Sequence, residues 1–457
     1  MANVATRDEH SILVTSGAIF PKMLAMAIPL AATSVMQLLF NAADVAVLGN
    51  FGSEFSVAAV GSTAALIHLV VNLFIGVSIG ANALVARYFG AGDSNLLSRT
   101  VHTSIALAIA CGAALMVVGI VFAEWSLRMM GAPEETMALS KLYVQICFCG
   151  AIPLMIYNFG CSILRSKGDT RRPLYYLTVS GVINTGLNVI FVTVCDLDVA
   201  GVAYATLISW CVSAFLILRC LMNETDDFRV ELRKLKIERG IAWDILKIGV
   251  PAGVQGIVFS LSNVVIQSSV NGFGPVVMAG SAAAQQVEGI VWTSMNAFAQ
   301  CALTFVSQNL GARQYRRIDR ITLTGFACVL CVGFILGSTA RIFAFPILSV
   351  FTQDPDSIAI GTRRIFWVCG FYYVCGLMDT IAFSIRGMGY NMTPTIVSLL
   401  GACGLRILWI MTVFQVPRWH TFDVLFTSYI VSWTVTFLAH CVCYYYMRRS
   451  ILRRVSA

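Results

Sequence analysis

One carboxylate stands inside an otherwise apolar stretch near the start of the chain. Asp44 lies in the apolar run Met23–Leu48, and no Lys or Arg occurs between Lys22 and Arg87. A carboxyl group within a membrane span costs several kcal/mol unless it is protonated, paired or bound to a cation. The pattern therefore predicts that Asp44 is the ion-coupling carboxylate of a secondary transporter. A structural hydrogen bond between helices is the alternative.

The composition indicates which elements must hold this carboxylate. The chain has 457 residues, of which 58% are hydrophobic and 12% charged, and its mean hydropathy is +0.79. These values are typical of a helical membrane protein and not of a soluble domain. At about 20 apolar residues per span, we expect an all-α integral membrane fold with twelve transmembrane helices. The expected spans are 22–49, 56–86, 100–122, 138–164, 174–195, 199–221, 243–270, 277–309, 321–345, 361–385, 394–416 and 422–447.

Lys and Arg predict the orientation of these spans. Most of the 31 fall in the N-terminal segment, in alternate loops and in the C-terminal tail, which would all face one side of the membrane. The positive-inside rule then places both termini in the cytoplasm. The net charge of +8 is explained by anionic lipid, so we expect no nucleic-acid partner. The polar N-terminus lacks an apolar core, so we expect no cleaved signal peptide.

The two halves of the chain repeat each other. Pro29 matches Pro251 (251 − 29 = 222), and Gly168 matches Gly389 (389 − 168 = 221). Because each half has an even number of spans, the halves would be parallel repeats related by a pseudo-two-fold axis along the membrane normal. The expected parts are a cytoplasmic N-terminal segment 1–21, a six-helix lobe 22–222, a cytoplasmic linker 223–242, a second six-helix lobe 243–447 and a basic cytoplasmic tail 448–457.

Three loops resemble those of a known family. Leu164–Thr170, followed by Pro173, resembles the signature loop of the MATE (multidrug and toxic compound extrusion) transporters, and so does Ile385–Gly389, followed by Pro394. Phe305–Ala312 resembles the family's loop after the eighth helix. The first helix is similar to the DinF-like bacterial branch, and the resemblance covers essentially the whole chain. It implies a two-lobed antiporter of the bacterial cytoplasmic membrane that exports organic cations or amphipathic compounds against H+ or Na+.

The resemblance also implies an ion site in the first lobe. The family pairs a first-helix Asp with an N-x-x-x-D motif and a Thr, and these positions fall on Asp44, Asn184 and Thr206. The Asp of the motif is Asn188 in this chain, which is a departure. With a rise of about 1.5 Å per residue, the polar groups lie at nearly one depth in the membrane. Hydrogen bonding between helices is the alternative role of the two Asn residues.

Further polar residues are candidates for substrate contact. Gln37, Asn41 and Asp44 are spaced four and three residues apart, so they line one stripe of the first helix. The family's substrate-facing Gln falls on Gln37, and a polar position of its fourth helix falls on Asn158. Tyr157 would supply apolar or cation–π surface near the site, although aromatic residues in spans more often serve packing.

The second lobe carries a polar pair of its own. Asp379 and Arg406 fall at the repeat positions of Asn158 and Asn184. A lone Arg within a span needs a partner, and Asp379 is the nearest acidic candidate. We predict that the two residues form a structural clamp, with a second ion site as the alternative.

Absent motifs narrow the function. The chain has no Walker-type phosphate loop, its five His lack metal-ligand spacing, and its 15 Cys lie mostly inside apolar runs. We therefore expect no enzyme activity and no cofactor. We expect a monomer with a cationic or amphipathic small-molecule substrate. Protons are favoured over Na+ because Asn188 leaves Asp44 as the only charge of the site.

Three alternatives remain open at this point. A lipid-linked oligosaccharide flippase of the same superfamily would favour a strongly cationic cavity. A membrane-embedded lipid-modifying enzyme would need clustered Asp or His around a metal ion. A membrane subunit or receptor without transport would not need Asp44 beside Asn184 and Thr206.

Overall fold

The structure is a computed structural model that describes residues 14–53, 56–129 and 134–456. Within these ranges the chain is helical, with short turns and no strand. The helices are α1 Ile19–Phe51, α2 Ser56–Ala91, α3 Ser94–Val121, α4 Ala123–Met129, α5 Glu134–Cys149, α6 Ala151–Lys167, α7 Arg171–Val189, α8 Asp198–Met222, α9 Arg239–Asn271, α10 Pro275–Gly311, α11 Tyr315–Ile342, α12 Ala344–Leu348, α13 Pro355–Val368, α14 Tyr372–Gly387, α15 Met392–Ser398, α16 Leu405–Met411 and α17 Phe422–Ser456.

The predicted number of spans is confirmed. Eleven of the described helical stretches are long and apolar enough to cross a membrane, and the bent pair α5 and α6 makes up a twelfth. The sequence predicts a single span over 138–164, whereas α5 and α6 are bent by 49° about Gly150. A Cβ atom at Gly150 would lie 2.7 Å from the ring of Trp210. The bend therefore brings the backbone directly against a bulky side chain, which only glycine permits.

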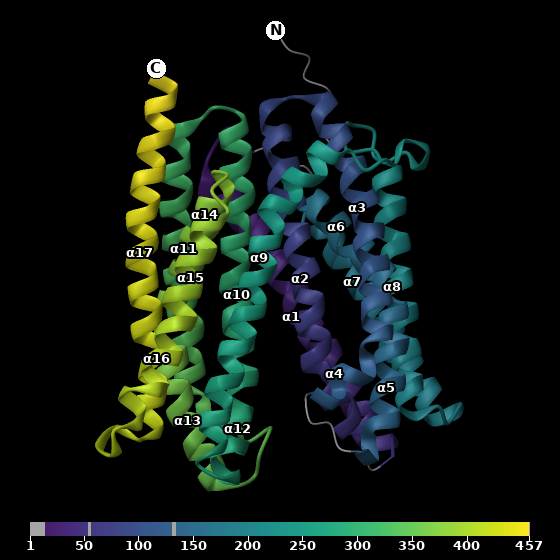
Figure 1. Ribbon diagram of the computed structural model, residues 1–457, viewed down its shortest axis with the longest axis vertical. Coiled ribbons are helices and arrows are strands. Elements are labelled where there is room, and N and C mark those ends of the chain that lie inside the picture. The colour runs from purple at the N-terminus through teal and green to yellow at the C-terminus, as the bar shows by residue number, and fades with distance from the viewer. Residues whose placement is uncertain (1–13, 54–55, 130–133, 457) are drawn as a thin grey trace. The chain divides into compact units, whose positions relative to one another are not determined.

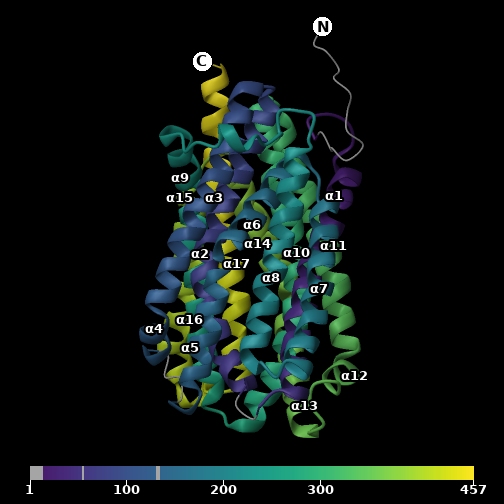
Figure 2. The same cartoon turned by 90° about the vertical axis from the view of Figure 1, so that its right-hand side faces the viewer.

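The chain divides into two compact units. Unit 1 is built on Ala32–Gly253, and unit 2 combines Gly17–Ala31 with Val254–Ala457. Within unit 2, α10, α11, α14 and α17 run side by side (Figures 1 and 2). The boundaries fall inside α1 and α9, in each case two residues after the proline, Pro29 or Pro251. The polar segment that follows α8 belongs to unit 1.

This polar segment is bound to α3 of the same unit. The backbone N–H of Glu231 donates to Nε2 of His102 (3.0 Å). Thr103 donates to the carbonyl of Lys236 (3.2 Å), and Arg99 forms an ion pair with Glu238. The linker predicted from composition is therefore packed along unit 1.

Glycines bring α2 and α9 together within unit 1. A Cβ atom at Gly76 would lie 2.2 Å from the backbone nitrogen of Gly253, and one at Gly80 would lie 2.9 Å from that of Gly249. Both helices thus present two glycines four residues apart, which is the spacing that permits close backbone approach in membranes. The role of Gly76 and Gly80 is therefore close helix contact.

Candidate functional site

The four predicted ion-site residues meet inside unit 1. Nδ2 of Asn188 on α7 donates to Oδ1 of Asp44 on α1 (2.5 Å). In the amide orientation that satisfies both of its ends, Asn184 donates to the same Oδ1 (2.8 Å) and accepts from the backbone N–H of Thr206 on α8 (3.3 Å). Asp44 and Thr206 are half-buried, and the two Asn side chains are buried. Three helices therefore converge on one carboxylate.

Asp44 has only neutral partners. Within the described ranges, no Lys or Arg nitrogen lies within 4 Å of its carboxylate. Two amide donors on one oxygen stabilise the ionised form, because hydrogen bonds to a charged acceptor are stronger than neutral ones. Oδ1 of Asn188 has no hydrogen-bond partner among the described residues although it is buried. The site thus holds an unused acceptor next to a carboxylate without a counter-charge.

A glycine on α7 sets the spacing between α1 and α7. A Cβ atom at Gly181 would lie 1.9 Å from the ring of Phe40, so the ring packs directly on the backbone of α7. Gly181 is one turn from Asn184, and Phe40 is one turn from Asp44. The contact therefore holds the two helices at the distance that the Asp44 hydrogen bonds require.

The residues predicted to contact substrate are found in different surroundings. Gln37 and Asn41 are exposed, on the same stripe of α1 as Asp44. Asn158 is half-buried, and its amide donates to the carbonyl of Leu154 within α6 (2.9 Å). Gln37 and Asn41 thus stay predicted substrate contacts, on the helix that carries Asp44.

Tyr157 lies in the core and not beside Asp44. Its ring belongs to an apolar cluster that includes Val101 and Ile217, and its hydroxyl donates to the carbonyl of Pro173 (3.3 Å). The neighbours of Asp44 on α1, Val47 and Leu48, belong to a different cluster. The structure therefore corrects the substrate prediction for Tyr157: its place on α6 turns the ring into the packing of α3 and α8.

Asp379 and Arg406 do not form the predicted direct pair among the described residues. Nε of Arg406 donates to Oγ of Ser432 (3.0 Å), and its guanidinium lies 4.1 Å from the ring centroid of Tyr429. Asp379 is half-buried; its side chain interacts with those of Trp292 and Asn296, and Arg406 acts on it only through longer-range electrostatics. The aromatic face and the hydroxyl provide the partners that a buried Arg needs, so the clamp joins α16 to α17.

Unit 2 contains a buried ion pair that was not predicted from the sequence. Arg364 on α13 donates to both oxygens of Glu288 on α10, at 2.7 and 2.8 Å, and also to Ser281. Arg364 lies near the start of its predicted span. A positive charge at that position is expected to belong to the preceding loop. The apolar run around Glu288 is the only signal that points to a pair, because a buried carboxylate requires a partner.

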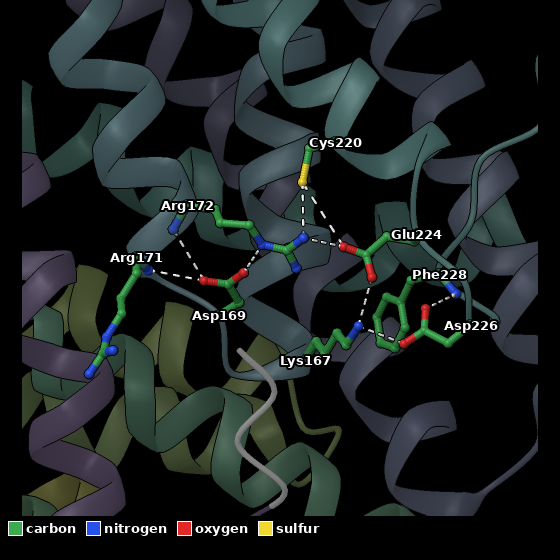
Figure 3. Close-up of polar contacts among 8 residues, drawn as sticks. All are labelled: Lys167, Asp169, Arg171, Arg172, Cys220, Glu224, Asp226 and Phe228. Carbon is green, nitrogen blue, oxygen red and sulfur yellow. Dashed lines mark hydrogen bonds and ion pairs between the residues drawn. The ribbon is translucent and has the colours of Figure 1, made fainter. Parts of the chain in front are cut away.

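The signature loop after α6 forms a second charge cluster, in unit 1 (Figure 3). The ammonium of Lys167 forms ion pairs with Glu224 (2.8 Å) and Asp226 (2.6 Å) and lies over the ring of Phe228. Arg172 bridges Asp169 and Glu224. The loop thereby ties α6 and α7 to the segment after α8, and its charges are internally compensated. Resemblance identifies this loop, but the sequence gives no sign that Lys167 is buried.

No metal cluster accompanies these charges. The described residues contain no group of three or more His, Cys, Asp or Glu side chains that could hold a metal ion. The chemistry available at Asp44 is therefore the binding of a proton or of a single cation by one carboxylate and neutral oxygens.

The family model described as MatE matches residues 29–190 and again residues 251–412. The matches are displaced by 222 residues (251 − 29 = 222), which confirms the repeat inferred from the prolines. The probable multidrug resistance protein YoeA of Bacillus subtilis (strain 168) is 28% identical over 389 residues, which is 83% of this chain and 84% of its own length. The FAD transporter of Shewanella oneidensis is 25% identical over 402 residues, which is 86% of this chain and 87% of its own.

Solved structures show the same fold. A multidrug resistance MATE family transporter in an outward-facing conformation has a TM-score of 0.87 at 19% identity, covering 97% of this chain and all of its own. A transporter of the same superfamily from Pyrococcus furiosus has a TM-score of 0.85 at 20% identity. These likenesses establish the twelve-helix, two-lobed architecture. The chain is thus a multi-pass membrane protein that belongs to the MATE family of multidrug efflux transporters.

Proposed function

We propose that the protein is an antiporter that exports organic cations or amphipathic drugs in exchange for protons, with Asp44 as the coupling carboxylate. One observation carries the proposal. The half-buried carboxylate of Asp44 accepts hydrogen bonds from neutral amides and has no cationic partner within 4 Å among the described residues. A charge held in this way is available to a proton or to a cationic ligand, and both cannot occupy it at once.

Mutual exclusion at Asp44 is what exchange requires. If a proton and a substrate oppose each other's binding, each promotes the release of the other by the same factor. Gln37 and Asn41 are exposed on the stripe of α1 that carries Asp44. A substrate bound along this stripe would lie close enough for its charge to compete with the proton.

Protons fit this site better than Na+ does. Na+ must exchange its hydration shell for several oxygen ligands, with enough negative charge to offset burial. Asn188 supplies an amide where the family motif has a second carboxylate. A proton neutralises Asp44 outright. If the side-chain amide of Asn188 rotates by half a turn, its unpartnered Oδ1 accepts a hydrogen bond from the new O–H of Asp44.

The proposed setting is the cytoplasmic membrane of a bacterium, with both termini inside and the chain acting as a monomer. The asymmetry of Lys and Arg among the loops supports this orientation. In this setting Asp44 faces the outer half of the membrane, so that it loads protons from outside.

Flux measurements in proteoliposomes test the proposal. Uptake of a fluorescent cation is followed with a pH gradient at zero sodium, and with a sodium gradient at equal pH on both sides. The proposal predicts transport with the pH gradient alone. Transport driven by sodium and not by the pH gradient would refute proton coupling, and transport driven by neither would refute antiport.

The name of one relative suggests a second substrate class. The FAD transporter of Shewanella oneidensis covers 86% of this chain, so FAD belongs in the same assay as a competitor. The flippase alternative is less well supported. Arg386 and Arg406 are both only 2% exposed, so neither is accessible to a lipid-linked pyrophosphate.

A further inference from the structure

A polar contact in unit 1 joins Ser53, just after α1, and Ser56, the first residue of α2, to the beginning of α8. The carboxylate of Asp198, the first residue of α8, accepts hydrogen bonds from the backbone N–H of Ser53 (3.2 Å) and from its hydroxyl (2.7 Å). It also accepts from the hydroxyl of Ser56 (2.5 Å). We call Ser53, Ser56 and Asp198 the clasp. The bonds span 142 and 145 residues of sequence, so they fix the place of α1 against α8.

The backbone is bent into an unfavourable conformation to make this contact. Asp198 has a φ of +46° and Asp196 a φ of +53°, both in the left-handed region that non-glycine residues rarely adopt. A π-helical segment, Ile190–Val194, directly precedes this turn. Such strain persists only where the surrounding structure enforces it, and it is concentrated at functional sites. The turn therefore holds the Asp198 carboxylate in place at a conformational cost.

The clasp lies next to two of the three helices that form the ion site, after the end of α1 and at the start of α8. Thr206 is eight residues from Asp198 along α8, and Asp44 is nine residues from Ser53 at the end of α1. At about 1.5 Å per residue both distances are about 12–14 Å along the helix axis. The contact of Phe40 with Gly181 lies one turn beyond Asp44 on the other side. Asp44 is thus held between two fixed points.

Unit 2 has an aromatic cluster at the equivalent place. The repeat offset places His420 at the position of Asp198 (420 − 198 = 222) and Phe273 at the position of Phe51 (273 − 51 = 222). The His420 ring lies 5.7 Å from the Phe273 ring and 4.2 Å from the Phe414 ring. In both units the turn that follows a long helix, α1 or α9, is thereby fastened to the segment at the start of α8 or α17. Only unit 1, which carries the coupling carboxylate, does so through a charge.

We propose that Asp198 is a positioning residue for the coupling site, because its clasp holds the end of α1 against α8, and Asn184 of α7 is hydrogen-bonded to both Asp44 and the α8 residue Thr206. The inference rests on the proposed function of Asp44. Without the clasp, the amide donors of Asn184 and Asn188 would meet Asp44 at altered distances. Proton binding would change even though the site's own residues are intact.

The test compares Asp198→Ala with Asp196→Ala in proteoliposomes. Asp196 is the matched control, because it has the same left-handed backbone but an exposed side chain. We expect Asp198→Ala to shift the pH of half-maximal efflux by about one unit, as expected for altered charge-assisted bonds, and Asp196→Ala to leave it unchanged. Asp198→Asn, which keeps one carbonyl acceptor, should shift it less. If Asp198→Ala is not inserted, Ser56→Ala replaces it, with a smaller shift expected in the same comparison.

The outcomes separate this proposal from the proposed function. A wild-type pH midpoint in the clasp variant, even with a lower melting temperature, would mean that the contact is only structural and would overturn the positioning role. Asp44→Asn is measured alongside. If it keeps the wild-type pH profile, the coupling role of Asp44 fails and the role of Asp198 fails with it. Hydrogen exchange of the amides of residues 44–53 should rise in Asp198→Ala and not in Asp196→Ala, and an unchanged rate would show that no clasp exists.

Discussion

The two units hold different side chains at the same four places of the repeat. In unit 1 these places carry an acid, two amides and a hydroxyl: Asp44, Asn184, Asn188 and Thr206. An offset of 222 residues leads in unit 2 to two aliphatic side chains, a cation and a hydroxyl: Ile266, Arg406, Ile410 and Ser428. The guanidinium of Arg406 packs on the ring of Tyr429. Unit 1 therefore holds a carboxylate at this place, while unit 2 holds side chains that pack.

Glu288 of unit 2 and Asp44 of unit 1 are carboxylates held in different ways. Glu288 of unit 2 is held by both arms of the Arg364 guanidinium, so its charge is already compensated. Asp44 of unit 1 is held by neutral amides. A carboxylate with a fixed counter-charge has little to gain from a proton, whereas one without it can exchange protons and cations. The comparison thus separates an acid in a fixed ion pair from the acid that we propose exchanges protons.

Asp44→Asn should have the largest effect, because it removes the titratable group of unit 1 and leaves the shape of the side chain. We expect coupled efflux from proteoliposomes to fall to the level of empty liposomes. The melting temperature in detergent should change by no more than about 2 °C. Asp196→Asn, which neutralises an exposed acid of the same unit, is the control and should transport normally. Wild-type efflux by Asp44→Asn would end the assignment.

Breaking the ion pair of unit 2 should reduce stability instead. Glu288→Gln leaves the buried Arg364 without a counter-charge, which costs about 3–5 kcal/mol of unfolding free energy. The double variant Glu288→Leu with Arg364→Leu should recover part of that loss, since no charge is then left alone. Chemical unfolding in detergent measures both. Equal stability of wild type and Glu288→Gln would show that the pair is not formed.

Asn188→Asp sharpens the comparison within unit 1. A second carboxylate beside Asp44 supplies the negative charge that Na+ needs, so transport should become sodium-dependent. With a sodium gradient we expect roughly tenfold more flux than in the wild type. A tenfold gain in Na+ affinity corresponds to about 1.4 kcal/mol of binding free energy. Measurement uses separate sodium and pH gradients. An unchanged ion preference would mean that Asn188 serves packing alone.

Asp379 and Arg406 should show the smallest effect, which is a coupling energy near zero. Since Arg406 finds its partners in Ser432 and Tyr429, the losses from Asp379→Ala and Arg406→Leu should add to within about 0.5 kcal/mol. A double-mutant cycle on unfolding free energy gives the value. A coupling of about 2 kcal/mol or more would restore the direct pair predicted from sequence.

Much of the fold was predictable because membrane spans have a strong local signal. Apolar runs of about 20 residues locate the spans, and Pro29 with Pro251 reveals the repeat. The bend at Gly150 was not predictable, because it depends on Trp210, which lies far away in sequence. The division of α1 and α9 between the units was not predictable either, since it follows from tertiary contacts and not from composition.

The site was predictable where residues share a helix or a depth. Spacing and resemblance together brought Asp44, Asn184 and Thr206 to one place. The orientation of Tyr157 depends on how α6 is rotated, which sequence spacing does not determine. The pair of Arg364 and Glu288 was not predicted. Arg364 lies near the start of a span, where a positive charge is expected to flank the membrane, and Glu288 is 76 residues away. The hydrogen bonds of Asp198 were not predicted, because they depend on a left-handed backbone that the sequence does not indicate.

Proton release on substrate binding tests the central claim most directly. Purified protein in weakly buffered detergent, at a pH where Asp44 is protonated, is mixed with a cationic substrate while a pH-sensitive dye records the protons released. We predict about one proton per bound substrate for the wild type, from the competition of both ligands for one carboxylate. Asp44→Asn should release none, and Asp196→Asn should release as many as the wild type. Release that is unchanged in Asp44→Asn, with substrate still bound, would contradict the account.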